Sequence, residues 1–129
     1  MKKLKQISFL AALALTLAAC ASSGVAENVG ASQFIEKIKE PGVVIVDVRT
    51  ADEYNSGHLQ EALNIDVNSS SFDAEIAALD KSVTYAIYCR SGNRSTVASG
   101  KMSDAGFTNL INFNEGGFAE LAQAGAQTK

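Results

Sequence analysis

The chain of 129 residues has no tryptophan, one proline, one histidine and two cysteines. One histidine without a clustered partner set makes no zinc site, so neither a metal nor a cofactor is expected. Two cysteines allow at most one disulfide. Basic residues are also in the minority, since 11 lysines and arginines stand against 14 carboxylates and give a net charge of −3. This acidity argues against nucleic acid as a partner.

The N-terminal residues have the layout of a signal peptide. Lys2, Lys3 and Lys5 form a basic start, and residues 7–17 are almost wholly apolar, with small residues after them. The apolar run is shorter than the ~20 residues that a bilayer-spanning helix needs. No charge occurs between Lys5 and Glu27, however, so an uncleaved anchor helix is the alternative.

Residues 17–20, Leu-Ala-Ala-Cys, resemble the lipobox of bacterial lipoproteins. The resemblance implies that Cys20 is diacylated and that the signal peptide, residues 1–19, is removed. Two acyl chains hold a protein stably on a membrane, whereas one chain is marginal. Because Ala21 and not aspartate follows the cysteine, the resemblance to Gram-negative lipoproteins implies export to the periplasmic face of the outer membrane.

Beyond a small, polar tether over residues 20–30, alternating patterns predict one α/β domain over residues 31–126. Helical patterns cover a segment capped by Ser32 and ended by Pro41, then residues 72–79 and 95–105. Apolar, β-branched runs predict strands over residues 43–48, 62–65, 83–88 and 110–113. Continuous apolar strands separated by helices indicate an open parallel sheet flanked by helices on both faces.

Cys89 follows the third predicted strand, at the end of a parallel sheet where chemistry gathers. Residues 90–95, Arg-Ser-Gly-Asn-Arg-Ser, then lead into a predicted helix. Such a loop directs backbone N–H groups at an anion, and the helix end adds positive potential. Arg90 and Arg94 are two of only three arginines in the chain. These surroundings predict a reactive thiolate; the alternative is a buried, inert thiol beside two solvated arginines.

Three groups of residues resemble the signatures of the rhodanese family. They are Asp47-Val48-Arg49 with Glu53-Tyr54, Gly57-His58-Leu59, Ala62 and Asn64-Ile65; then Tyr88 to Ser95; then Gly116-Gly117-Phe118. The resemblance covers roughly residues 30–125 and implies a rhodanese-like fold. It departs at Leu121, where many members have tryptophan, and at Gln127, where proline is common. Both departures concern packing near the C-terminus.

The resemblance implies a sulfurtransferase in which Cys89 carries sulfur as a persulfide. The expected donor is a small anion such as thiosulfate or a persulfide, and the acceptor is cyanide, a thiol or a protein thiol. Loop amides would stabilise the persulfide, and Arg90 or Arg94 would engage the anionic donor. The expected substrate-binding residues are Arg90, Ser91, Gly92, Asn93, Arg94 and Ser95.

Four further residues are expected to support the site without taking part in chemistry. Asp47, Arg49 and Glu53 predict an ion-pair network at a strand end. His58, in the Gly-His-Leu segment, is expected to hold a turn by hydrogen bonding.

Two other functions compete with sulfur transfer. Phosphatases of related fold carry an arginine six positions after the cysteine, whereas here Arg94 lies five positions after Cys89 and Ser95 occupies the sixth. The second competitor is a non-catalytic rhodanese-type binding module. Inactive members typically lose the cysteine, and this chain keeps it.

The lipobox interpretation predicts the behaviour of a Cys20→Ser variant. The variant has no thiol to acylate, so we expect it to remain unprocessed and unlabelled by palmitate. Cell fractionation with labelled palmitate measures this, with the unmodified chain as the control. Label incorporated into Cys20→Ser would show that a residue other than Cys20 is lipidated, and it would contradict the lipobox interpretation.

Overall fold

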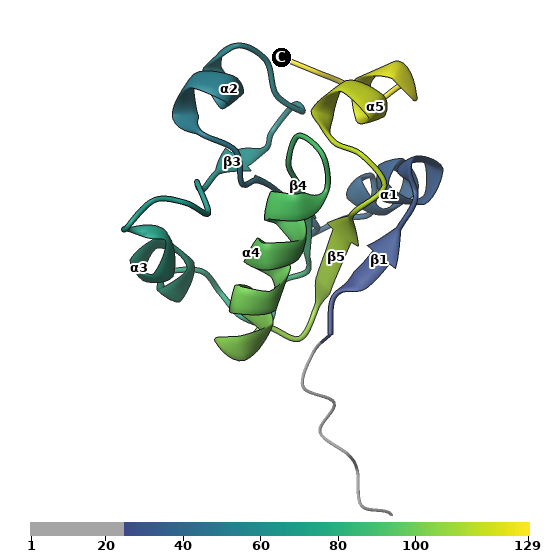
Figure 1. The fold of residues 1–129 in the computed structure, drawn as a ribbon. Helices are drawn as coiled ribbons and strands as arrows, with labels where there is room; N and C mark the ends of the chain where they lie inside the picture. Colours follow the sequence, from purple (N-terminus) through teal and green to yellow (C-terminus); the bar gives the residue numbers. More distant parts are fainter. Residues whose placement is uncertain (1–24) are drawn as a thin grey trace, which may run out of the picture.

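The computed structural model describes residues 25–129, so the expected signal peptide and Cys20 lie outside the described residues. Helices and strands alternate along this part of the chain (Figure 1). The strands are β1 (Glu27–Val29), β2 (Val44–Asp47), β3 (Leu63–Asn64), β4 (Tyr85–Tyr88) and β5 (Leu110–Phe113). The helices are α1 (Ala31–Ile38), α2 (Ala51–Asn55), α3 (Phe72–Ala77), α4 (Asn93–Asp104) and α5 (Phe118–Gln123). No helix within the described range is long and apolar enough to cross a bilayer.

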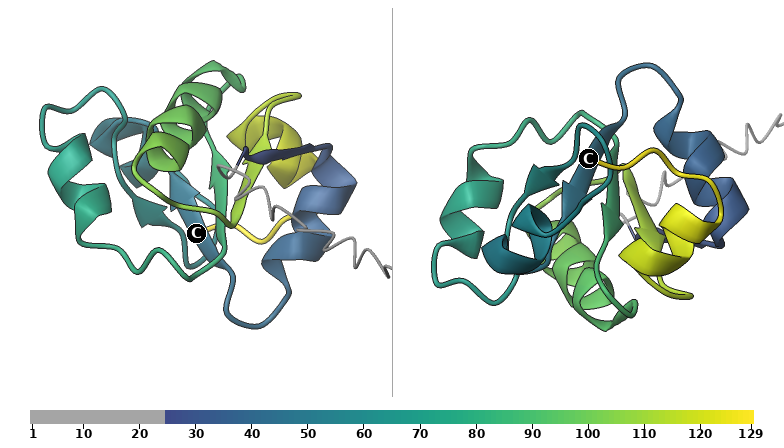
Figure 2. Two further views of the ribbon diagram at one scale, coloured as in Figure 1. Left: turned by 90° about the horizontal axis from the view of Figure 1, so that it is seen from below. Right: turned by 90° about the horizontal axis from the view of Figure 1, so that it is seen from above.

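The strands form one sheet in the order β1-β5-β4-β2-β3, and every pair is parallel. Figure 2 shows α3 and α4 on one face of this sheet and α1 and α5 on the other. The prediction of an open parallel sheet flanked by helices on both faces is confirmed. Because all strands run the same way, their carboxyl ends meet at one edge, where Asp47 of β2 lies beside Tyr88 of β4.

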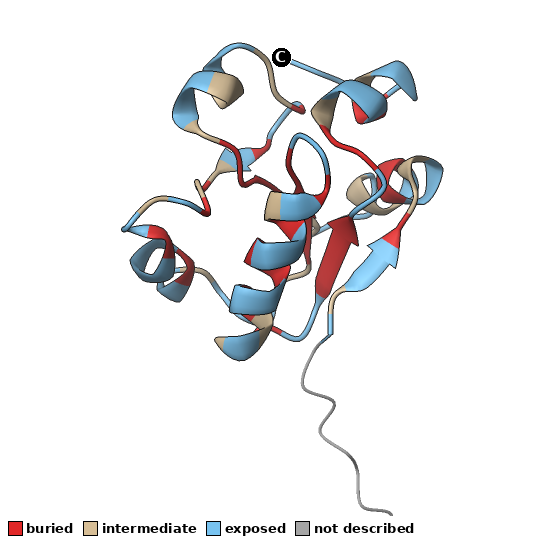
Figure 3. Cartoon of the chain, viewed as in Figure 1, coloured by how far each residue is buried: buried red, intermediate tan, exposed pale blue. Residues whose placement is uncertain are grey.

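Two apolar cores hold the layers together, one on each face of the sheet. Phe72, Met102 and Phe107 belong to the core beneath α3 and α4. Phe34 and Leu121 belong to the core beneath α1 and α5. Figure 3 shows that burial is concentrated in the central strands, and β4 and β5 are buried at every position. Two-sided burial explains why these strands are continuously apolar.

Three short elements were not expected from the sequence. The tether predicted over residues 20–30 is wrong at Glu27–Val29, which forms β1 and pairs with β5 at the sheet edge. Only Val29 of this strand is buried, so its sequence carries little strand signal. Helices α2 and α5 have five and six residues, too short for a helical period to show.

Helix boundaries also differ from the prediction. Helix α1 begins at Ala31 after Gly30, so Ser32 is inside the helix and is not its N-cap. Helix α4 begins at Asn93 and not at Ser95, because Gly92, with φ +91°, reverses the chain three residues after Cys89. The loop between β4 and α4 is therefore shorter than expected.

A buried polar network ties the carboxyl ends of β2 and β4 together. The carboxylate of Asp47 accepts three hydrogen bonds from the Arg49 guanidinium, at 2.7, 3.0 and 3.1 Å. It also accepts the Tyr88 hydroxyl at 2.7 Å, and that hydroxyl accepts the Leu59 N–H at 2.9 Å. Arg49 further donates to the Gly57 carbonyl at 2.7 Å. Every described charge in this network is paired, as buried charges require.

Replacing Tyr88 by Phe should therefore destabilise the fold by about 2 kcal/mol, because one buried acceptor and one buried donor lose their partner. Tyr85→Phe is the matched control, since its hydroxyl donates only to the Asp80 carbonyl in a partly exposed position. We expect the control to lose about 1 kcal/mol or less. Urea unfolding of both variants measures the difference, and equal losses would contradict the role given to the network.

Candidate active site

Cys89 lies at the carboxyl end of β4, is fully buried and is the free cysteine of the described residues. The Gly92 N–H donates to its sulfur at 3.1 Å. Burial alone would raise the pKa of the Cys89 thiol. Hydrogen bonds from the Ser95 hydroxyl and from the backbone amides of Ser95, Ser91 and Gly92 outweigh burial and lower the pKa. The site thus favours a thiolate, as a nucleophilic cysteine requires.

The loop after Cys89 is held from two directions by backbone contacts that only glycine permits. A Cβ on Gly92 would collide with the Asn114 carbonyl, and φ at Gly92 is +91°. A Cβ on Gly117 would collide with the backbone of Cys89 and Arg90. The next residue, Phe118, donates its N–H to the Cys89 carbonyl at 2.9 Å. The segment Gly116-Gly117-Phe118, which resembles the final signature of rhodaneses, thus packs across the cysteine loop and holds it in place.

The predicted network of Asp47, Arg49 and Glu53 is wrong in one member. Arg49 pairs with Asp47, but Glu53 pairs with Arg94 through two hydrogen bonds of 2.7 and 2.9 Å. The Arg94 guanidinium, together with hydrogen bonds from Thr50, lowers the pKa of Glu53 to about 2 despite partial burial. Glu53 thereby links the N-terminus of α2 to the first turn of α4.

The two loop arginines consequently differ. The guanidinium of Arg94 is engaged in the bidentate ion pair with Glu53. Arg90 is exposed and forms no hydrogen bond or ion pair with any residue between 25 and 129. Arg90 also lines a cavity of about 310 Å³ beside the loop, together with Arg49, Glu53, Ser56, Gly57, Phe118 and Ala119. A small anion entering this cavity meets Arg90 as the available cation.

The remaining predicted site residues either act on the Cys89 sulfur through their backbone or make their contacts elsewhere. Ser91 and Asn93 have exposed side chains, and Ser91 acts on the sulfur through its amide. His58 stacks on the Tyr54 ring at 3.7 Å, and its Nδ1 lies 2.8 Å from the Tyr54 carbonyl oxygen. Its backbone exchanges hydrogen bonds with Lys129. The part of the chain that the structure covers holds no group of three or more potential metal ligands.

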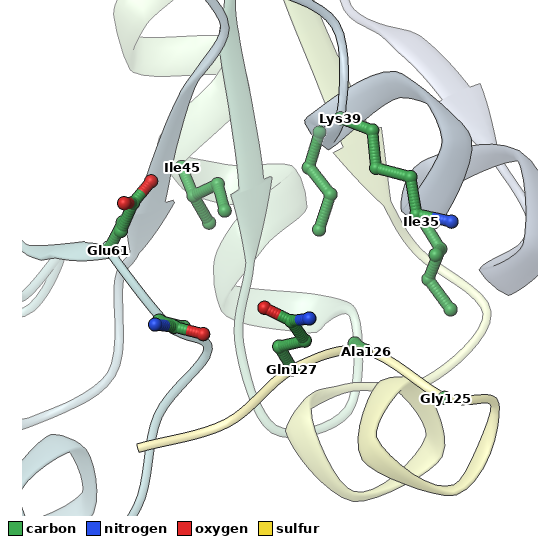
Figure 4. Close-up of a pocket in the computed structure, with 9 residues that line it drawn as sticks. Ile35, Lys39, Ile45, Glu61, Gly125, Ala126 and Gln127 are labelled. Atoms are coloured by element: carbon green, nitrogen blue, oxygen red, sulfur yellow. The ribbon is translucent and has the colours of Figure 1, made fainter.

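A second cavity, of about 480 Å³, lies on the face covered by α1 (Figure 4). Its walls come from α1, β2, the turn around Glu61 and the C-terminal segment around Ala126. No residue of the Cys89 loop lines this cavity. The part of the structure that could carry out a reaction is therefore the Cys89 loop and the smaller cavity beside it.

Comparisons with known proteins identify the family of the chain. The model of the rhodanese-like domain family matches residues 30–124. The chain is 32% identical over 77 residues to the thiosulfate sulfurtransferase PspE of Escherichia coli, covering 60% of this chain and 72% of that protein. It is 33% identical over 107 residues to a tRNA uridine(34) hydroxylase of Yersinia enterocolitica, covering 78% of this chain and 30% of that protein.

Solved structures show the same similarity. The rhodanese-like domain of an Anabaena protein superposes with a TM-score of 0.70 at 25% identity, covering 79% of this chain and 77% of that one. A rhodanese-related protein from Thermoplasma volcanium superposes with a TM-score of 0.69 at 27% identity, covering 80% and 97%.

The hydrogen bonds to the sulfur predict that Cys89 ionises below the ordinary thiol value of ~8.5. Alkylation by iodoacetamide should therefore reach half of its maximal rate below that pH. Arg94→Ala should raise the midpoint only partly, because the amide donors remain and Glu53 already neutralises much of the arginine charge. His58→Asn is the control and should leave the midpoint nearly unchanged. A wild-type midpoint at or above ~8.5 would contradict the amide cradle. Loss of reactivity in folded His58→Asn alone would indicate a Cys-His pair.

Proposed function

Because this chain belongs to the rhodanese-like domain family, we propose that it is a sulfurtransferase that carries sulfane sulfur as a persulfide on Cys89. The observation that carries this proposal is the thiol placed among inward-pointing amides, whose hydrogen bonds lower its pKa. The thiosulfate sulfurtransferase among its relatives supports the same reaction class.

In the first step the Cys89 thiolate attacks the outer sulfur of thiosulfate. The new S–S bond forms as the old one breaks, and sulfite leaves with the electron pair. In the second step cyanide or a thiolate attacks the terminal sulfur of the persulfide, and Cys89 leaves as a thiolate. No proton has to be removed from the enzyme when the thiolate is already formed. Two half-reactions through a covalent intermediate give ping-pong kinetics.

The loop amides support both steps. The donors that lower the pKa of Cys89 are those of Ser91, Gly92 and Ser95. Fixed N–H donors stabilise developing negative charge without having to reorganise. The same donors would therefore stabilise the persulfide anion between the two steps.

Arg90 is proposed to bind the anionic end of the donor. It is exposed and lines the cavity beside the loop, while Arg49 and Arg94 are bound to carboxylates. A charge-assisted hydrogen bond to a sulfonate oxygen suits a guanidinium without a competing partner. The sequence leaves the choice between Arg90 and Arg94 open, and the ion pair of Arg94 with Glu53 supports Arg90.

Phosphatase activity is the weaker enzymatic alternative. Arg94 comes one residue earlier than the arginine of phosphatase loops, and here it is bound to Glu53. A purely binding role is the other alternative, and the favourable setting of the thiolate argues against it.

We also propose that the protein acts at a membrane, exported and held by a lipid on Cys20 at the periplasmic face of the outer membrane. The support for this proposal is the lipobox-like segment over residues 17–20 and the basic, apolar start before it. An exported location would bring the enzyme to small sulfur anions and to external thiols.

The reaction class is tested by comparing wild type with Cys89→Ser on thiosulfate plus cyanide and on an aryl phosphate. We expect the wild type to form thiocyanate and the variant to form none, because serine is not a persulfide carrier. Arg90→Ala should raise the KM for thiosulfate more than it lowers kcat. Phosphate release without thiocyanate would reverse the order of the two enzymatic functions.

A further inference from the structure

The larger cavity, between α1 and the C-terminal segment, has the size of a small-molecule site. Its volume of about 480 Å³ lies within the roughly 300–1,000 Å³ that such sites enclose. Four parts of the chain form its walls, namely α1, β2, the turn around Glu61 and the segment that follows α5. Because no residue of the Cys89 loop lines this cavity, sulfur transfer does not account for it.

Backbone hydrogen bonds hold two walls of this cavity together. The Gln60 N–H donates to the Gln127 carbonyl at 2.9 Å, and the neighbouring residues Leu59 and Thr128 form an antiparallel bridge. The Ala126 N–H donates at 3.0 Å to a carbonyl of α5, which fixes the C-terminal segment against that helix. The cavity therefore has walls of hydrogen-bonded backbone.

Glu61 holds a backbone conformation that residues with side chains disfavour. Its φ is +68°, and among the described residues it is the one with positive φ that is not glycine. The Ala62 N–H donates to the Leu59 carbonyl at 3.0 Å and closes a tight turn, in which a position with positive φ favours glycine or asparagine. A glutamate at this position keeps its side chain against the preference of the backbone. Such conformations are concentrated at functional sites, and the Glu61 side chain lies at the cavity (Figure 4).

The charges around the cavity leave one carboxylate without a partner. The Lys39 ammonium lies 3.5 Å from the Glu36 carboxylate, so this pair is neutral as a unit. Glu61 is exposed and forms no hydrogen bond or ion pair with any residue between 25 and 129. The side-chain amides of Gln60 and Gln127 also line the cavity, and their oxygens can accept hydrogen bonds. The polar rim therefore favours a ligand that carries positive charge and donates hydrogen bonds.

Beneath this rim the lining is aliphatic. Ile35, Ile45 and Ala126 are buried, and Ile38 is half-buried. All four belong to the core beneath α1 and α5 or pack against it. An alkyl chain in the cavity would remove the apolar surface that they still expose from water, which is favourable.

We propose that this cavity binds a small aliphatic amine, with the alkyl chain on the isoleucines and the ammonium group at Glu61. The proposal does not depend on the sulfurtransferase reaction, because it concerns a site that the Cys89 loop does not line. It gives Glu61 a reason to occupy a position that suits glycine, since the carboxylate is the group that selects the cation.

The test is a titration of the full chain with n-hexylammonium, followed by the NMR signals of the isoleucine methyl groups. Ile35, Ile38 and Ile45 should shift and saturate, whereas Ile76 and Ile87 of the other core should not. Hexanoate has a similar alkyl chain and the opposite charge, so it should bind roughly tenfold more weakly. Equal affinities for the two compounds, shifts spread over both cores or the absence of saturable shifts would each overturn the proposal. Tighter binding of the peptide Gly-Lys-Gly than of hexylammonium would assign the cavity to a partner's lysine and overturn the small-molecule assignment.

Three variants test the role of Glu61. Glu61→Gln keeps the shape of the side chain and should raise the Kd for hexylammonium roughly two- to fivefold. Glu75→Gln makes the same change at an exposed position of α3, on the opposite face of the sheet, and should leave this Kd unchanged. Glu61→Gly suits a positive φ, so it should keep at least the wild-type urea midpoint while losing the preference for hexylammonium over hexanoate. Unchanged selectivity in Glu61→Gln, or a clearly lower urea midpoint in Glu61→Gly, would show that Glu61 serves the fold and would overturn the assignment.

Discussion

The hydrogen bonds that converge on the buried sulfur of Cys89 are the interaction on which the rest of the site depends. A thiolate removed from water is costly unless fixed donors replace the solvent. The donors come from Gly92, Ser91 and Ser95, and the chain must curl tightly to aim them at one atom. That curl requires a positive φ at Gly92 and close backbone contact with Asn114. The backbone at Gly117 packs against Cys89 and Arg90 and holds the loop from its other side.

A second constraint separates structural charges from the charge available to a ligand. Asp47 with Arg49, and Glu53 with Arg94, form ion pairs that connect β2, α2 and α4 around the loop. Buried and half-buried pairs of this kind specify geometry more than they add stability. They leave Arg90 as the arginine without a partner among residues 25–129. A site in an acidic chain thereby keeps one guanidinium open toward the cavity beside Cys89.

Local sequence patterns predicted the elements whose burial is two-sided and the loop that follows β4. An apolar run ending at a cysteine, with glycine and arginines after it, is a local signal. The partner of Glu53 was not predictable in this way, because Arg94 is 41 residues away and either arginine fits the pattern. Strand β1 was missed because an edge strand of three residues buries only Val29. The sequence shows Asn112 as a lone amide in an apolar strand, but it does not show the contact with Thr96, because that contact depends on how α4 packs on β5.

The central claim is that Cys89 itself carries the sulfur. Mass spectrometry of the purified protein after incubation with thiosulfate tests it without assuming an acceptor. The account predicts one added sulfur atom on the peptide that contains Cys89, and its loss when cyanide is added. An unmodified Cys89 peptide in folded protein, with the thiol still free for alkylation, would contradict the account.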